Sequence, residues 1–178
     1  PPPPPPLTYR PVVVTQQLAA GITPAQAYRW LSQWSNSAPK FLVPPGAQHT
    51  SSGQVQGNGF LPGAVFETTF TKQKMSGMSN HSTMRLQVTK WTFTVLDANQ
   101  MQGMVRFSVD RQDVTPGITT VNLGPSGQLQ TTSLFQFSTG TSGATVLSLT
   151  TSVQVNPDVA QSKKPGPPCC LFFPLCWP

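Results

Sequence analysis

The acidic residues are the first place to look for catalysis, because the chain has so few of them. Only five carboxylates are present, at Glu67, Asp97, Asp110, Asp113 and Asp158. Glycosidase chemistry needs two carboxyl groups that flank one cleft. Glu67 and Asp110 fall in strand-like segments and form the one plausible pair, whereas Asp97 and Asp113 lie in turn contexts and Asp158 follows a proline. The carboxylates therefore predict no general acid–base site beyond this single candidate pair.

Histidine and glycine patterns give no further catalytic motif. The two histidines, His49 and His81, lie in segments rich in Ser, Thr and Gly, and no HExxH, CxxC or His-x-Glu pattern accompanies them. The chain also has no GxSxG elbow, P-loop or GxGxxG motif. We therefore expect no catalytic residue, no metal site and no cofactor, and we interpret the chain as a non-enzyme, with enzymatic activity left open.

All three cysteines lie in the last ten residues, at Cys169, Cys170 and Cys176. Three interpretations of this apolar tail remain open. Cys170 and Cys176 could close a small disulfide loop, or the cysteines could be acylated beside Lys163 and Lys164, which together would give a two-signal membrane anchor. In the third interpretation the tail packs on the rest of the domain. We expect membrane contact, if any, only through this tail.

Composition indicates a weakly charged, polar surface. Charged residues make up 9% of the chain, where about 25% is usual, and Thr, Ser and Gln provide most of the polar side chains. The net charge is +6, but the eleven basic residues are scattered, so we expect no nucleic-acid partner. Asn80-His81-Ser82 is an N-glycosylation sequon. Sparse charge, the sequon and the absence of cysteine outside the tail favour a secreted or cell-surface location.

Local signals predict a strand and one short helix near the N-terminus. Residues 12–18 are rich in β-forming residues. Thr23-Pro24-Ala25-Gln26 matches a capping box with proline at the first helical position. Ala27, Trp30, Leu31 and Trp34 follow at helical spacing. We expect a helix over residues 24–34, ended by residues 35–39, and irregular chain over residues 41–63.

From residue 64 onward the apolar residues alternate, which is typical of strands. Strands are predicted near residues 64–70, 83–96, 101–110, 129–138 and 144–155, with a hairpin turn at 97–100 and a short strand within 118–123. The apolar phase changes between Val88 and Trp91, which predicts a β-bulge near Thr89 and Lys90.

The predicted architecture is an α+β fold with a curved antiparallel β-sheet of six to seven strands, one short N-terminal helix and Pro-rich arms at both ends. Residues 1–11 form the first arm, residues 12–157 the β-rich domain, and residues 158–178 the Pro- and Cys-rich apolar tail.

Three segments resemble the START-like (SRPBCC) superfamily, the helix-grip fold of polyketide cyclases, lipid-transfer START domains and pathogenesis-related plant proteins. Residues 22–31 resemble its strand-to-helix start, residues 84–110 its central hairpin, and residues 144–155 its last strand. Members of the superfamily end in a long amphipathic helix that closes an apolar cavity. The chain after Val155 is Pro-rich and departs from that pattern, so the apolar tail or another subunit would have to fill the place.

The resemblance implies non-catalytic binding or transport of an apolar small molecule or lipid in a helix-grip cavity. Arg85 or Arg106 would meet a polar head group. Aromatic side chains would line the cavity: Trp34, Phe66, Phe70, Trp91, Phe93, Phe107 and Phe135.

A second hypothesis is an extracellular structural or adhesion module. Pro-rich segments flank the β-rich domain on both sides, and an uncovered sheet edge or face would be completed by a neighbouring copy. In that case the protein would self-associate through its termini and hold no ligand.

Overall fold

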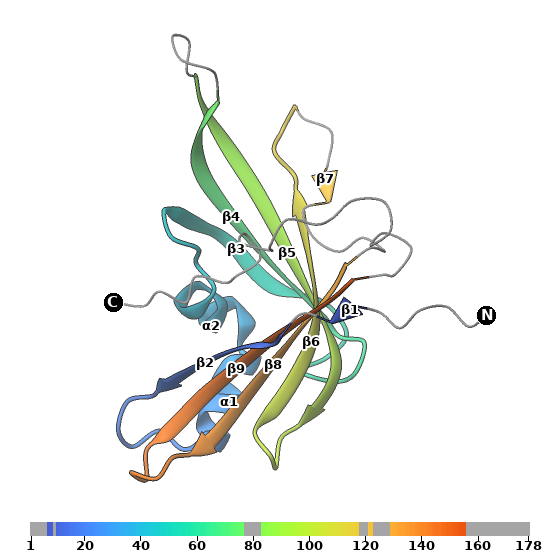
Figure 1. The fold of residues 1–178 in the computed structure, drawn as a ribbon. Coiled ribbons are helices and arrows are strands. Elements are labelled where there is room, and N and C mark those ends of the chain that lie inside the picture. The colour runs from blue at the N-terminus through green and yellow to red at the C-terminus, as the bar shows by residue number, and fades with distance from the viewer. Residues whose placement is uncertain (1–6, 9, 77–82, 118–120, 123–128, 156–178) are drawn as a thin grey trace, which may run out of the picture.

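One antiparallel sheet makes up most of the described chain (Figure 1). The computed structural model describes residues 7–8, 10–76, 83–117, 121–122 and 129–155. Neighbouring strands follow the order β1-β9-β8-β6-β5-β4-β3, with β2 also on β9 and β7 on β6. The strands are β1 (Leu7–Thr8), β2 (Val12–Gln17), β3 (Ala47–Gln56), β4 (Val65–Ser76), β5 (Thr83–Asn99), β6 (Met104–Asp113), β7 (Val121–Asn122), β8 (Leu129–Thr139) and β9 (Thr145–Val155).

The sheet has seven strand positions, because β1 and β2 share one edge. Leu7 pairs with Val155 and Val12 pairs with Thr151, so both segments run along β9 in nearly one register. The predicted α+β class and curved antiparallel sheet are confirmed. Two residues of the segment predicted as an N-terminal arm thus add to the sheet, and residues 1–6 and 156–178 lie outside the described residues.

The first helix forms as its sequence predicts. Helix α1 spans Pro24–Ser32, and its capping box is complete: Gln26 N–H donates to Thr23 Oγ1 at 3.2 Å, and Thr23 N–H donates to Gln26 Oε1 at 2.8 Å. Ala27 and Leu31 are buried as expected. Trp30 was expected on the same face but is 39% exposed, and Tyr28 is buried in its place.

A second helix replaces the predicted helix terminator, so the prediction of a single helix is wrong. Helix α2 spans Trp34–Phe41 and contains Pro39 in its last turn. Trp34, Ala38 and Leu42 recur at a spacing of four and are all buried, which is the apolar stripe of a helix. Proline signalled a stop, but burial of that stripe outweighed the loss of one backbone hydrogen bond.

Strand β3 corrects the prediction of an irregular segment over residues 41–63. The strand is ten residues long and lies at an edge of the sheet, paired with β4. It is polar and lacks an alternating apolar pattern, and its register shifts between His49 and Ser51 and again between Gln54 and Gln56. A bulged, half-exposed edge strand leaves no clear period in its sequence.

The predicted bulge near Thr89 and Lys90 is absent from the described pairing of β5 with β4. That register runs without a shift from Val65–Thr94 to Ser76–Thr83. The irregularity instead lies between Val95 and Asp97, opposite β6, and the hairpin turn follows at residues 100–103. The change of apolar phase within β5 therefore places two sets of apolar side chains on opposite faces of the sheet.

The core lies between the two helices and one face of the sheet, which we call the inner face. Trp34, at the start of α2, contacts Phe66 of β4, Phe93 of β5 and Phe107 of β6, with ring centroids 4.9–5.6 Å apart. These four side chains are at most 2% exposed. No described helix is long and apolar enough to cross a membrane.

Candidate functional site

The aromatic residues predicted to line a cavity form a packed cluster on the inner face. Each of them is at most 5% exposed. Phe70 contacts Trp91 edge-on at 5.7 Å, and Phe107 contacts Phe135 at 5.7 Å. The seven residues thus come together as the sequence reasoning expected, and their rings pack on one another and on α2. The cluster comprises Trp34, Phe66, Phe70, Trp91, Phe93, Phe107 and Phe135.

A short chain of hydrogen bonds crosses this cluster. The indole Nε1–H of Trp34 donates to Thr68 Oγ1 at 2.9 Å, and Ser52 Oγ donates to the same oxygen at 3.3 Å. His49 Nε2 lies 2.6 Å from Ser52 Oγ. Which of the two groups donates in that contact depends on the tautomer of His49. The Ser–His pair therefore ties the edge strand to the core.

The two arginines proposed to meet a head group lie on opposite faces. Arg85 pairs with Lys74 and shares the inner face with Phe70 and Trp91 through the alternation of the strands. Arg106 lies on the outer face and forms an ion pair with Asp97 at 3.4 Å. Arg85 is therefore on the same face as the aromatic cluster and Arg106 is not.

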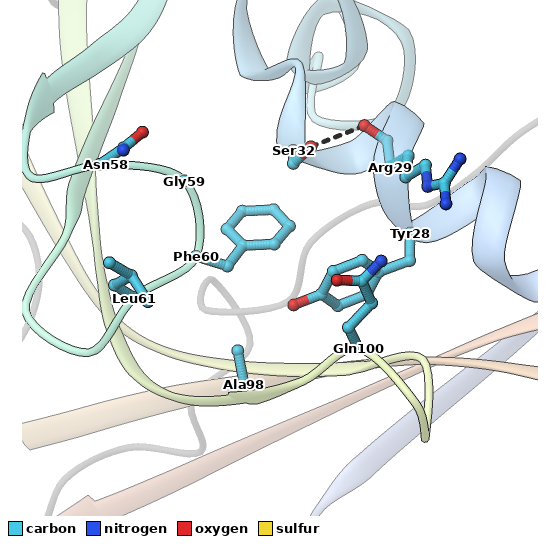
Figure 2. Close-up of a pocket in the computed structure, with 9 residues that line it drawn as sticks. All are labelled: Tyr28, Arg29, Ser32, Asn58, Gly59, Phe60, Leu61, Ala98 and Gln100. Atoms are coloured by element: carbon cyan, nitrogen blue, oxygen red, sulfur yellow. Dashed lines mark hydrogen bonds between the residues drawn. The ribbon is translucent and has the colours of Figure 1, made fainter.

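An open pocket of about 510 Å³ lies at one end of the aromatic cluster (Figure 2). Three segments form it: α1, the loop between β3 and β4, and the end of β5 with the turn that follows it. Its volume is within the roughly 300–1,000 Å³ of small-molecule sites. The lining residues are Tyr28, Arg29, Ser32, Asn58, Gly59, Phe60, Leu61, Ala98 and Gln100.

Two rings form the apolar wall of this pocket. Tyr28 contacts Phe60 edge-on, with centroids 5.4 Å apart. Phe60 in turn contacts Phe66 at 5.4 Å and Phe107 at 5.7 Å. The pocket wall is therefore the outermost layer of the aromatic cluster, and a molecule in the pocket would rest on rings that are held in place from behind.

The polar groups beside these rings are neutral. Ser32, Asn58 and Gln100 each contribute an uncharged hydrogen-bonding side chain, and the guanidinium of Arg29 is directed away from Phe60 (Figure 2). Burial raises the pKa of the Tyr28 phenol, so this hydroxyl stays protonated at neutral pH and can donate a hydrogen bond.

Backbone contacts hold the β3–β4 loop that carries Phe60. Gly63 N–H donates to Val95 O at 2.8 Å, and Ala64 N–H donates to Leu61 O at 2.9 Å. Gly57 has a φ of +79°, and a Cβ there would lie 2.8 Å from Ala64 Cα. A residue with a Cβ at position 57 would therefore clash with Ala64 unless the backbone of the loop moved.

The candidate carboxylate pair lies on the face of the sheet opposite the aromatic cluster. Glu67 and Asp110 both pair with Thr92, from strands on either side of β5, and lie on the outer face. Glu67 forms an ion pair with Lys90 at 3.1 Å. Within the described ranges, no group of three or more His, Cys, Asp or Glu residues could hold a metal ion.

Several predicted sites fall on parts of the chain that are not described. Asn80, the candidate glycosylation residue, lies in the 77–82 gap, and Cys169, Cys170 and Cys176 lie beyond residue 155. Glycosylation, acylation and a tail disulfide therefore stay predictions.

The pocket residues were missed by sequence reasoning. Tyr28 was overlooked because Trp30 matched the apolar spacing of the helix, and Phe60 stands in a Gly- and Pro-rich segment without period. The available signal was that Phe60 lies in a Gly-rich loop, because binding residues are disproportionately carried by loops on a rigid scaffold.

Comparison with solved structures identifies proteins that share this fold. No protein-family model matches the chain, and no curated protein matches it by sequence. Among solved structures, ginseng major latex-like protein 151 from Panax ginseng aligns with a TM-score of 0.52 at 9% identity, covering 91% of this chain and 86% of that one. Norcoclaurine synthase from Thalictrum flavum, in a complex with a transition-state analogue, aligns with a TM-score of 0.50 at 14% identity, covering 88% and 81%.

The chain has a START-like fold. The sequence resemblance is thereby confirmed at the level of the fold, and at these identities the likeness extends to the fold alone.

Proposed function

We propose that the protein binds a largely apolar small molecule or lipid in the pocket beside Tyr28 and Phe60. The observation that carries this proposal is that an open pocket of about 510 Å³ has the end of the buried aromatic cluster as its wall. An apolar molecule placed there gains burial against rigid rings at a free energy of about 25 cal/mol per Å². The neutral side chains around the rings would orient it through hydrogen bonds.

The fold supports the same proposal. A norcoclaurine synthase with this fold holds a transition-state analogue, so the architecture accommodates a small organic molecule. The predicted aromatic residues would then pack against the back of the pocket wall. Phe60 would connect the pocket to the aromatic cluster, because it lines the pocket and contacts Phe66 and Phe107. Binding is proposed without a reaction, since no described side chains form a general acid–base pair next to these rings.

A larger side chain that fills the pocket tests whether the pocket is the binding site. Ser32 lines the pocket, whereas Ser35 is exposed and is not a lining residue. The neutral apolar dye Nile red is titrated into the wild type, Ser32→Phe and Ser35→Phe. We expect Ser32→Phe to weaken dye binding at least about tenfold, and Ser35→Phe to leave it unchanged. Equal binding by all three proteins would refute the pocket as the site.

The structural or adhesion module remains the second hypothesis. It depends on the Pro-rich segments at both ends, which lie outside the described residues apart from Leu7–Thr8 and residues 10–11. Its distinguishing expectation is a concentration-dependent oligomer that is lost when these segments are removed.

A further inference from the structure

Tyr28 presents a polar atom to the pocket that no described residue engages. The residue is 7% exposed, and its ring packs edge-on against Phe60. Among the described residues, no hydrogen bond involves its hydroxyl, and the oxygen is not one of the fully enclosed side-chain atoms that lack a partner. The oxygen can therefore be reached from the pocket. In Figure 2 it is directed toward the side of the pocket that Phe60 and Ala98 line.

The surroundings of this hydroxyl disfavour a charged ligand group. Burial raises the pKa of Tyr28, so the phenol is neutral and able to donate at neutral pH. Arg29 is the one charged residue among the lining residues, and its guanidinium is directed away from Phe60 (Figure 2). An anion held against the rings would lose water without meeting a cation, which costs more free energy than placing a neutral polar group there.

A pure hydrocarbon would match the pocket poorly for a different reason. It would cover the Tyr28 hydroxyl and displace water from it without supplying an acceptor, and a covered donor without a partner costs free energy. A molecule with an acceptor oxygen at that point replaces the displaced water, while the rest of its surface packs on the rings. The pocket therefore favours an apolar body that carries one neutral acceptor.

We propose that the Tyr28 hydroxyl selects a neutral ligand whose apolar body carries a carbonyl-type acceptor oxygen, as in a ketone or an ester. This inference rests on the proposed function and narrows the class of ligand. Tyr28 would donate to the carbonyl oxygen, and the ring of Phe60 would pack against the apolar body. The selectivity arises from a donor that is already held in place by its ring, so binding orders no further side chain at that point.

Three naphthalene probes of similar shape separate the ligand classes. 2-Acetylnaphthalene carries a ketone, 2-ethylnaphthalene lacks the acceptor, and 2-naphthoate carries a negative charge. Each probe is titrated into the protein by calorimetry at physiological ionic strength, where long-range attraction by the net charge of +6 is largely screened. We expect the ketone to bind at least about tenfold more tightly than the carboxylate.

Tyr28→Phe is the decisive variant, because it removes the hydroxyl and keeps the ring. Since the probes differ in their own hydration, the informative quantity is the change in each affinity on this substitution. We expect 2-acetylnaphthalene to bind about fivefold more weakly, which corresponds to one neutral hydrogen bond, and 2-ethylnaphthalene to bind as tightly as before. The unfolding midpoint should stay at the wild-type value, because the hydroxyl has no hydrogen bond within the described fold.

Phe60→Leu is the matched control for the pocket wall. It removes a ring and leaves the Tyr28 donor in place, so it should weaken both neutral probes by a similar factor. A selective effect of Tyr28→Phe beside a uniform effect of Phe60→Leu would separate recognition of the carbonyl oxygen from packing on the rings.

Two outcomes would overturn this inference and leave the proposed function intact. The first is an equal effect of Tyr28→Phe on both neutral probes, while Ser32→Phe still weakens their binding. The second is binding of 2-naphthoate at least as tight as that of the ketone, in which case Arg29→Gln would identify Arg29 as its partner. If no probe binds, or if Ser32→Phe binds every probe like the wild type, the proposed function is refuted and this inference with it.

Discussion

Thr68 is the residue on which the buried polar contacts of the aromatic cluster converge. It is fully buried, and its hydroxyl oxygen accepts hydrogen bonds from Trp34 and Ser52. Thr68→Val keeps the shape of the side chain and removes that acceptor. We expect a loss of about 1–3 kcal/mol in the free energy of unfolding, because a buried indole donor loses this partner. Urea denaturation monitored by tryptophan fluorescence measures the loss.

Thr68→Ser is the control for this prediction. It keeps the hydroxyl and removes one methyl group, so its cost should come from the lost packing, about 1 kcal/mol. If the Val variant were as stable as the wild type, the Trp34–Thr68 hydrogen bond would contribute nothing to the fold.

Asp113 makes stability depend on pH. The hydrogen bond from the Thr115 hydroxyl lowers the pKa of Asp113 the most, and hydrogen bonds from Gln87 and from the Thr115 backbone, with the charge of Lys74, lower it further. A carboxyl whose folded-state pKa is lowered stabilises the protein above its unfolded-state pKa, and the contribution is lost as pH falls through the folded-state pKa.

The stability difference between the wild type and Asp113→Asn should therefore be constant near neutral pH. It should shrink as the pH falls below 3.8, the ordinary value for this group. Unfolding midpoints measured from about pH 6 to about pH 2.5 check this. A difference that stayed constant over the whole range would show that Asp113 gains nothing from Thr115 and Gln87.

At the residue scale, sequence reasoning identified the aromatic cluster but not its role in packing. Periodicity assigns Phe66, Phe93 and Phe107 to one face of the sheet, and the structure places them there. Whether such a face lines a cavity or packs against other elements depends on what covers it. The indole of Trp34 fills that space, and its position depends on the second helix, which the sequence did not reveal.

At the element scale, α1 depends on its N-terminal cap. Thr23→Ala removes the side-chain oxygen that accepts from Gln26 N–H. We expect a loss of about 1 kcal/mol in the free energy of unfolding. Thr23→Ser retains the cap and should lie within a few tenths of a kcal/mol of the wild type. Thermal unfolding followed by circular dichroism compares the three proteins, and an unchanged alanine variant would contradict the role of the cap.

The β3–β4 loop depends on Gly57. An alanine there adds a Cβ against the backbone of Ala64 at a positive φ, so Gly57→Ala should destabilise the protein by more than about 1 kcal/mol. It should also weaken Nile red binding, because Phe60 belongs to the same loop.

Gly59 provides the comparison for the loop prediction. It also has a positive φ, but a Cβ there meets nothing within 4 Å. Asparagine tolerates this conformation, so Gly59→Asn should leave the stability close to that of the wild type. Equal effects of the two substitutions would show that backbone conformation, and not the close approach to Ala64, sets the cost.

Most elements could be predicted from local patterns, and the exceptions have physical reasons. The capping box predicted α1, and alternation predicted most of the strands from residue 64 onward. Helix α2 was missed because Pro39 resembles a terminator, and β3 was missed because a polar edge strand with two register shifts has no period. In both cases tertiary packing decided what local propensity left open.

At the scale of the whole molecule, β5 runs from the two-stranded end of the β4–β5 hairpin to the pocket. Its first residues include Arg85 and the exposed Met84 and Leu86, and its other end borders the pocket through Ala98 and, in the turn that follows, Gln100. At about 3.3 Å per residue, these ends are roughly 40 Å apart.

Native mass spectrometry of the protein from its natural source, followed by denaturing mass spectrometry of the same sample, tests ligand binding most directly. The account predicts a discrete non-covalent mass on the folded monomer that is lost on denaturation, and its absence from Ser32→Phe produced in the same host. A ladder of oligomers with no released molecule would contradict ligand binding and favour the structural module.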